Sequence, residues 1–110
     1  MNQRDIILLS YPFSDLLGKK VRPAIIISND EYNKKFEDIV AVPLTTNLKL
    51  RDYAFLLTNK DLESGRLIKD SNVKVDRIFS VEKKLVRLVI GKVKKDIHKK
   101  IIEILMSIVK

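Results

Sequence analysis

Apolar residues fall in short, β-branched runs as far as Val93, and only the last stretch of the chain has helical spacing. Runs of this kind are too short for helices and are typical of strands that bury one or both faces. The pattern predicts a mainly β (α+β) fold. The predicted strands cover residues 5–10, 24–28, 38–44, 53–57, 72–76, 78–81 and 86–93.

The segment from Lys95 to Val109 is the one predicted helix. Its lysines fall toward the side opposite its apolar stripe, so the helix is amphipathic. We expect the stripe to pack on the sheet or on a partner subunit. In the preceding strand, Gly91 indicates a bulge or a close approach of two backbones. The apolar positions of the helix are Ile97, Ile101, Ile104, Leu105 and Ile108.

The chain has 110 residues, the usual size of one domain, so we expect residues 1–110 to share a single core. It contains no cysteine, which excludes disulfides, thiolate nucleophiles and cysteine zinc sites. The first apolar run is short and follows Asp5 rather than a basic segment, unlike a secretory signal. No run approaches the roughly 20 apolar residues needed to span a bilayer. We therefore expect a cytoplasmic protein with no membrane partner.

Positive charge is in clear excess. The chain carries 22 lysines and arginines against 14 acidic residues, a formal net charge of +8. Most of this excess lies between Val81 and Lys100, near the C-terminus. It favours a polyanionic partner, either a nucleic acid or an acidic protein, over a merely solvated surface. Charge alone does not name the ligand.

Three sequence blocks follow one another in a particular order. They are VRPAIIISND (21–30), VPLTTN (42–47) and DSNVKVD (70–76), and the segment YPFSD (11–15) precedes them. Each block alone is a weak signal. In this order, in a basic chain that ends in an amphipathic helix, they resemble the PemK/MazF family of toxins from bacterial toxin–antitoxin pairs. The resemblance covers essentially the whole chain.

This resemblance implies a small open antiparallel β-barrel of the CcdB/PemK (plasmid maintenance toxin) type with a C-terminal helix. It implies an endoribonuclease that cuts single-stranded RNA without a metal or other cofactor, with messenger RNA as the expected target, and so inhibits translation and growth. The expected assembly is a homodimer whose RNA groove runs over both subunits. The expected protein partner is an antitoxin whose acidic, disordered tail occupies that groove.

Position by position, the resemblance places Arg22 and Thr45 in the catalytic pocket. It places Asp76 at the acidic position after the fifth strand and Lys74 at the cationic position two residues earlier. The chain departs from many relatives, which have arginine in place of Lys74 and glutamine in place of Arg77. Lysine keeps the positive charge but lacks the planar, two-pronged grip of arginine on phosphate.

A ribonuclease without a metal must make the 2′-hydroxyl attack the phosphate, protonate the departing 5′-oxygen and stabilise charge on the phosphorane oxygens. The sequence has one histidine, His98, which lies among lysines of the predicted helix. We expect it at the surface, which excludes a catalytic histidine pair. Arg22 suits charge stabilisation, because a guanidinium stays protonated and can hold two phosphate oxygens. Pro23 keeps Arg22 in extended backbone.

Each candidate also has a structural interpretation. Thr45 could donate its hydroxyl to phosphate or orient the 2′-hydroxyl, or it could stabilise the turn after Pro43. Asp76 could be the base if burial raises its pKa, or it could only orient Lys74 through a salt bridge that lowers that pKa. Arg22 could pair with a nearby carboxylate. The other acidic residues are scattered and give no metal-ligand spacing.

Polar and aromatic residues between the first two predicted strands indicate a loop. Lys19 and Lys20 near its end could lie against a phosphate backbone. Tyr11 and Phe13 in this loop, and Tyr53 later in the chain, could stack on unpaired bases, the usual way in which proteins read single-stranded RNA. Each of the three aromatics could instead belong to the core or to a hinge.

Two other functions remain open at this point. One is a CcdB-type toxin that poisons DNA gyrase by binding it. Toxins with that activity depend on aromatic or apolar residues at the extreme C-terminus, whereas this chain ends Met-Ser-Ile-Val-Lys. The other is a non-catalytic nucleic-acid-binding module that uses the same positive surface. Neither would cleave RNA.

Overall fold

The computed structural model describes residues 1–11 and 20–110. In this part of the chain, eight strands form one antiparallel sheet in the order β4-β6-β3-β2-β1-β8-β5, and β7 pairs with β3. The strands are β1 (Asp5–Tyr11), β2 (Lys20–Ile26), β3 (Asp38–Thr45), β4 (Ala54–Leu57), β5 (Leu62–Gly65), β6 (Ser71–Lys74), β7 (Phe79–Glu82) and β8 (Val86–Val93). The α-helices are α1 (Asp30–Lys35) and α2 (Lys95–Val109), and the 3-10 turns are η1 (Asn59–Asp61), η2 (Val75–Arg77) and η3 (Lys83–Leu85).

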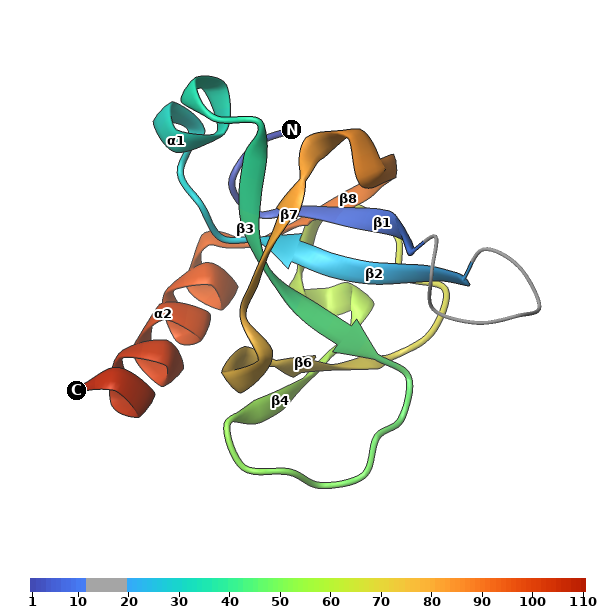
Figure 1. Cartoon of the computed structure of the whole chain (residues 1–110). Coiled ribbons are helices and arrows are strands. Elements are labelled where there is room, and N and C mark those ends of the chain that lie inside the picture. The colour runs from blue at the N-terminus through green and yellow to red at the C-terminus, as the bar shows by residue number, and fades with distance from the viewer. Residues whose placement is uncertain (12–19) are drawn as a thin grey trace.

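The sheet curls into an open half-barrel, and α2 lies along one side of it (Figure 1). This confirms the predicted fold class, a bent antiparallel sheet with a C-terminal helix. The helix has the predicted bounds and buries Ile97 and Ile101 against the sheet. Neither α1 nor α2 has the length and apolar character that a membrane-crossing helix requires.

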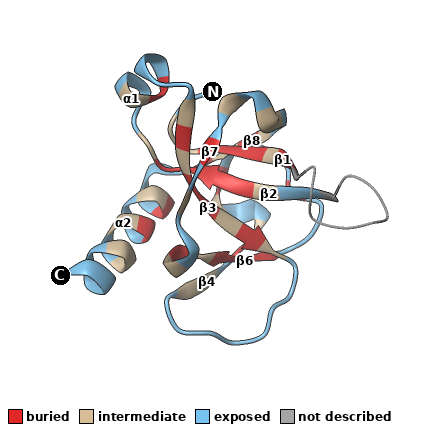
Figure 2. Ribbon diagram, viewed as in Figure 1, coloured by how far each residue is buried: buried red, intermediate tan, exposed pale blue. Residues whose placement is uncertain are grey.

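The central strands are buried on both faces (Figure 2). Successive side chains of a strand point to opposite faces. Ile6 of β1 therefore packs in the cluster that contains the apolar stripe of α2, whereas Ile7 and Leu9 pack in a second cluster on the far face. This is why the runs predicted as strands are apolar at consecutive positions rather than at alternate ones.

Gly91 lies at the predicted bulge and close approach. The register between β1 and β8 shifts at this point, because Ile6 pairs with Gly91 but Ile7 pairs with Val89. A Cβ on Gly91 would meet the carbonyl oxygen of Ser64 at 2.7 Å. On the opposing strand Gly65 has φ +78°, and a Cβ there would collide with the backbone carbonyl group of Ile90. Both positions therefore require glycine.

The structure differs from the predicted strand pattern in three places. Strand β2 begins at Lys20 and ends at Ile26, whereas the predicted strand covers residues 24–28. The sequence predicts no strand over residues 58–65, but Leu62–Gly65 is strand β5, in which Leu62 alone is buried. The strand predicted over 72–76 ends at Lys74 and continues as the turn η2. Strand alternation therefore does not extend to Asp76 and does not place it on one strand face with Lys74.

The helix α1 was not predicted from the sequence. It is six residues long and has one buried residue, Asn33, so it shows no apolar periodicity. Its signals are at its ends, because the Asn29 side chain accepts a hydrogen bond from the backbone N–H of Tyr32. Acidic residues follow in the first turn and basic residues in the last, as the helix dipole favours.

Candidate active site

Three strands bring Arg22, Thr45 and Lys74 to one end of the sheet. β2 and β3 pair with Ala24 opposite Pro43, so the same register continued by two residues sets Arg22 opposite Thr45. Paired residues on neighbouring strands point to the same face of the sheet, and so do residues two apart on one strand. Arg22 and Thr45 therefore project from the same face of the sheet, and β6 brings Lys74 beside them from the other side of β3.

These three side chains line one open cavity of about 290 Å³, to which Arg77 of η2 adds a further cation. Its other lining residues are Pro43 and Leu44. Arg22 is exposed, whereas Thr45 and Lys74 are half-buried. A hydroxyl and three cations therefore face the same space, and within the described residues no carboxylate lines it.

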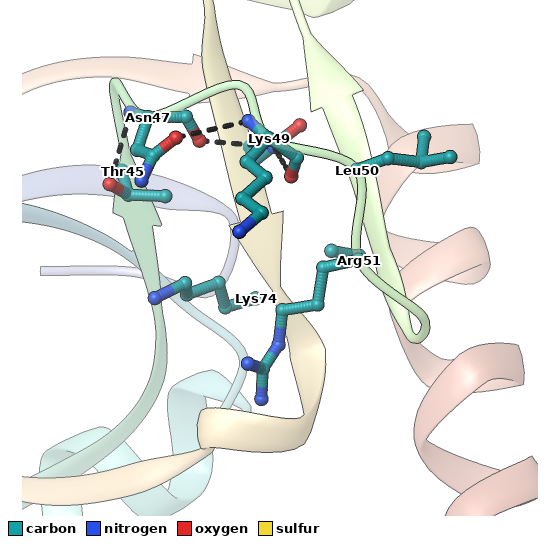
Figure 3. Close-up of a pocket in the computed structure, with 8 residues that line it drawn as sticks. Thr45, Asn47, Lys49, Leu50, Arg51 and Lys74 are labelled. Carbon is teal, nitrogen blue, oxygen red and sulfur yellow. Dashed lines mark hydrogen bonds between the residues drawn. The ribbon is translucent and has the colours of Figure 1, made fainter.

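A second cavity of about 250 Å³ adjoins the first, because Thr45 and Lys74 line both. The β3–β4 loop, residues 46–53, contributes Lys49 and Arg51 to it. Figure 3 shows Lys49 and Arg51 entering from the loop and Lys74 from β6. We call the two cavities together the cationic groove. Its charged and hydroxyl-bearing residues are Arg22, Thr45, Lys49, Arg51, Lys74 and Arg77.

The β3–β4 loop is held in place by Asn72 of β6. The Asn72 side chain is buried, and its Nδ2 donates to the carbonyl oxygens of Asn47 at 3.1 Å and Lys49 at 3.3 Å. At the other end of the loop, the backbone N–H of Val75 donates to the carbonyl oxygen of Tyr53 at 3.1 Å. The loop therefore presents its cations from a fixed backbone.

The Thr45 hydroxyl has the turn-stabilising contact that the sequence suggested. Its Oγ1 accepts a hydrogen bond from the backbone N–H of Asn47 at 3.2 Å. A hydroxyl has two acceptor sites and one donor, so this bond orients the oxygen and leaves the O–H able to donate. The turn and a contact to phosphate are therefore compatible roles.

Asp76 forms its ion pair with Arg51 rather than with Lys74. The Arg51 Nη2 donates to Asp76 Oδ2. This hydrogen bond holds the pKa of Asp76 below its ordinary value, and the charges of Arg51 and Arg77 act in the same direction against the effect of burial. Asp76 Oδ1 is buried and has no hydrogen-bond partner among the described residues. A carboxylate in this setting is a weak base.

Of the predicted RNA-binding residues, Tyr53 can be located. Its side chain is 50% exposed at the end of the β3–β4 loop. Its backbone has φ +62°, an uncommon conformation for a bulky residue. Phe13 and Lys19 lie outside the described residues. The structure describes the backbone of Tyr11 and Lys20 but not their side chains.

His98 is half-buried rather than at the surface. Burial is the main cause that lowers its pKa, and the charge of Arg4 adds to it. Its Nδ1 is buried without a hydrogen-bond partner among the described residues. His98 does not line the cationic groove. Across residues 1–11 and 20–110, no group of three or more histidine or acidic side chains lies together as a metal site would require.

Sequence reasoning missed Lys49, Arg51 and Asn72. The first two lie between two predicted strands, in a segment that directly follows Thr45 and contains two cations. Asn72 is a polar residue at the start of the predicted strand over 72–76, and its hydrogen bonds to the loop explain why it is buried. By contrast, none of the cations between residues 81 and 100 lines the groove.

The fold is that of solved toxin structures. The MazE–MazF structure (form II) from Deinococcus radiodurans has a TM-score of 0.81 at 19% identity, over 99% of this chain and 95% of that chain. An endoribonuclease in complex with its cognate antitoxin, from a mycobacterial species, has a TM-score of 0.76 at 23% identity, over 99% and 94%. The Mycobacterium tuberculosis toxin MazF-mt6 has a TM-score of 0.75 at 16% identity, over 94% of each chain. At these identities, the likeness shows a common fold.

Residues 2–109 match the family of PemK-like, MazF-like toxins of type II toxin–antitoxin systems. The chain belongs to this family, whose members are RNA-cleaving toxins. The family and the class of enzyme predicted from the sequence are thereby confirmed. No curated protein matches the chain.

Proposed function

We propose that this toxin cleaves single-stranded RNA, with messenger RNA as its target, and that the cationic groove binds the strand and positions the scissile phosphate. The observation that carries the proposal is the shared cavity of Arg22, Thr45 and Lys74. A guanidinium, a hydroxyl and an ammonium facing one space are the donors that a phosphodiester with developing negative charge requires.

In the proposed reaction, the 2′-oxygen bonds to phosphorus as its proton leaves, and the bond from phosphorus to the 5′-oxygen breaks as that oxygen gains a proton. The products are a 2′,3′-cyclic phosphate and a 5′-hydroxyl, with no net change in protons and no metal. Arg22 stabilises the phosphorane oxygens, and the Thr45 hydroxyl donates to one of them. Lys74, as an ammonium, is the donor to the leaving 5′-oxygen.

Asp76 is assigned an orienting role in this mechanism. The sequence left open whether it is the base or an ion-pair partner. Its ion pair with Arg51 and its lowered pKa favour the second role, because a general base works best with a pKa near the working pH. Removal of the 2′-hydroxyl proton is assigned to solvent.

The proposal is tested by incubating the purified protein, in excess chelator, with a single-stranded RNA oligonucleotide and with its deoxy counterpart. We expect the RNA to be cut to 2′,3′-cyclic phosphate and 5′-hydroxyl ends and the DNA to stay intact. Cleavage that required an added divalent ion, or that gave 5′-phosphate ends, would contradict the mechanism. Two intact strands would instead favour a gyrase poison or a non-catalytic module, which the family match does not favour.

We also propose an acidic antitoxin, a homodimer and a cytoplasmic site of action, where messenger RNA is translated. The relatives from Deinococcus radiodurans and from a mycobacterial species were solved as complexes with their antitoxins. A groove lined by five cations suits an acidic segment as well as RNA. Exposed apolar side chains near the end of α2, Met106 and Val109, are available for a subunit interface. Light scattering of the free protein tests the dimer.

A further inference from the structure

We propose that Arg51 is a second phosphate-binding arginine of the cationic groove, and that Asp76 is the residue that positions it. This inference rests on the proposed function, because it concerns the same RNA strand. It assigns to Arg51 a phosphate next to the scissile one. It assigns to Asp76 a role that does not include contact with RNA.

The first support is the arrangement of the two cavities. Thr45 and Lys74 line both of them, Arg22 lines only the first, and Arg51 lines only the second. The two guanidiniums therefore belong to adjoining compartments with a shared wall. A strand whose scissile phosphate lies beside Arg22 and Thr45 would continue past Lys74 into the compartment of Arg51.

The second support is how Arg51 is held. Its side chain is 38% exposed, and the ion pair engages its Nη2 with one carboxylate oxygen of Asp76. A guanidinium has donors on three nitrogens, so Arg51 retains N–H groups for a phosphate while Asp76 holds it. Asp76 itself is 24% exposed and lines neither cavity, so the groove is lined by the arginine of this ion pair and not by its carboxylate.

The third support is the fixed backbone on both sides of Arg51. Asn72 holds the carbonyl group of Lys49, and Val75 holds that of Tyr53. Val75 precedes Asp76 in the same turn, η2. The turn that supplies the carboxylate therefore also fixes the end of the loop that supplies the arginine. An arginine ordered before RNA binds loses less side-chain entropy on binding.

The binding test uses a single-stranded DNA oligonucleotide, which cannot be cleaved by 2′-hydroxyl attack, and fluorescence anisotropy. Arg51→Ala should weaken binding by about 10- to 100-fold, the usual cost of a lost charged hydrogen bond. The plot of log affinity against log salt should become shallower by about 0.7 in slope, the value for one lost contact to a single strand. Arg66→Ala is the matched control, because Arg66 is exposed and does not line the groove. Equal affinity of the two variants would overturn the proposal.

The cleavage test separates positioning from chemistry. Arg51→Ala should raise KM by about the factor seen in binding and leave kcat within about threefold, because the interaction is present before and during the reaction. Arg51→Lys should recover part of the affinity, which a folding defect would not allow. A large fall in kcat at unchanged KM would instead place Arg51 at the reacting phosphate and contradict the assignment.

The role of Asp76 is tested by a double-mutant cycle in the same binding assay. Asp76→Asn should weaken binding in the wild-type background, because Arg51 loses its partner, and should cause no further loss in the Arg51→Ala background. Loss of kcat in Asp76→Asn at unchanged affinity would make Asp76 the base and overturn its positioning role. Binding is measured on DNA and cleavage on RNA, so the two proposals can fail separately. A protein that bound the DNA but did not cut RNA would refute the proposed function, whereas the role of Arg51 is decided by the binding data.

Discussion

At the scale of single residues, the site is a small number of polar groups whose roles follow from what each already contacts. Thr45 accepts a backbone hydrogen bond and keeps its O–H. Asp76 is neutralised by Arg51. Arg22 is exposed near the start of β2, and within the described residues no carboxylate lies at ion-pair distance from it. Its interpretation as a structural ion-pair partner therefore has no support from these residues.

Two variants of Thr45 test whether its hydroxyl takes part in cleavage. Thr45→Ser keeps the O–H and the oxygen that accepts from Asn47, whereas Thr45→Val keeps the shape and loses both. We expect Thr45→Val to lower kcat by about 100-fold, the usual effect of removing one donor to a developing oxyanion. Thr45→Ser should stay within about tenfold of wild type. If the valine variant cut RNA at the wild-type rate, Thr45 would be a turn residue alone.

The Asp76–Arg51 pair predicts a pH dependence of stability. Because the folded-state pKa of Asp76 lies below its ordinary value of 3.8, the pair stabilises the fold above that value. The contribution is lost as pH falls through the lowered pKa. The difference in unfolding free energy between wild type and Asp76→Asn should therefore be largest near neutral pH and shrink below pH 3.8. Urea titrations across this range measure it, and a difference that grew in acid would contradict the ion pair.

At the scale of elements, the close contact between β5 and β8 fixes the edge of the half-barrel. Gly65 is in the left-handed region and its missing Cβ leaves space for the backbone of Ile90 and Gly91. β5 is short and mostly exposed. Its attachment therefore depends on backbone pairing and on this close approach more than on side-chain burial.

We expect Gly65→Ala to lower the unfolding free energy by at least about 2 kcal/mol, because a Cβ would both strain a positive φ and collide with a backbone oxygen. Ser64→Ala, at the exposed neighbouring position, should change it by less than about 0.5 kcal/mol. Denaturation in urea compares the two. Similar small losses for both variants would show that the two backbones separate easily.

The sequence predicted the elements with the strongest periodicity and missed those without any. Strands β1, β3 and β8 and the helix α2 have close to their predicted bounds, because each contains a run of apolar residues or a clear apolar stripe. α1 and β5 bury one residue each, so their apolar pattern carries no signal. At the site, the meeting of Arg22 with Thr45 was expected from the family resemblance. The pairing of Arg51 with Asp76 joins residues 25 positions apart through a loop, and no local pattern predicts it.

At the scale of the whole molecule, the net charge of +8 is spread over more than one surface. The C-terminal lysines that dominate the sequence pattern lie mostly exposed on and before α2, whereas the groove takes its cations from β2, the β3–β4 loop, β6 and η2. A family toxin must attract RNA from solution and also hold one phosphate in register. We expect the exposed C-terminal lysines to attract RNA and the groove cations to hold the phosphate.

The salt dependence of binding distinguishes the two sets. With three to five groove cations on phosphates, log affinity for a single strand should fall with log salt at a slope of about 2 to 3.5. Lys94→Ala and Lys95→Ala should lower the association rate at low salt and leave the slope nearly unchanged. Anisotropy and stopped-flow measurements give both quantities. If these lysine variants reduced the slope as much as Arg22→Ala, the groove would not be the main phosphate-binding surface.

The most direct test of the account is the cleavage of single-stranded RNA, in excess chelator, by wild type, Arg22→Ala and the charge-matched control Arg66→Ala. Single-turnover rates at saturating protein isolate the chemical step from binding. We predict that Arg22→Ala slows this step by at least about 100-fold, because it removes the guanidinium that stabilises the phosphorane, while Arg66→Ala cleaves like wild type. An Arg22→Ala protein that cleaved at the wild-type rate would contradict the central claim that Arg22 and Thr45 act on one phosphate.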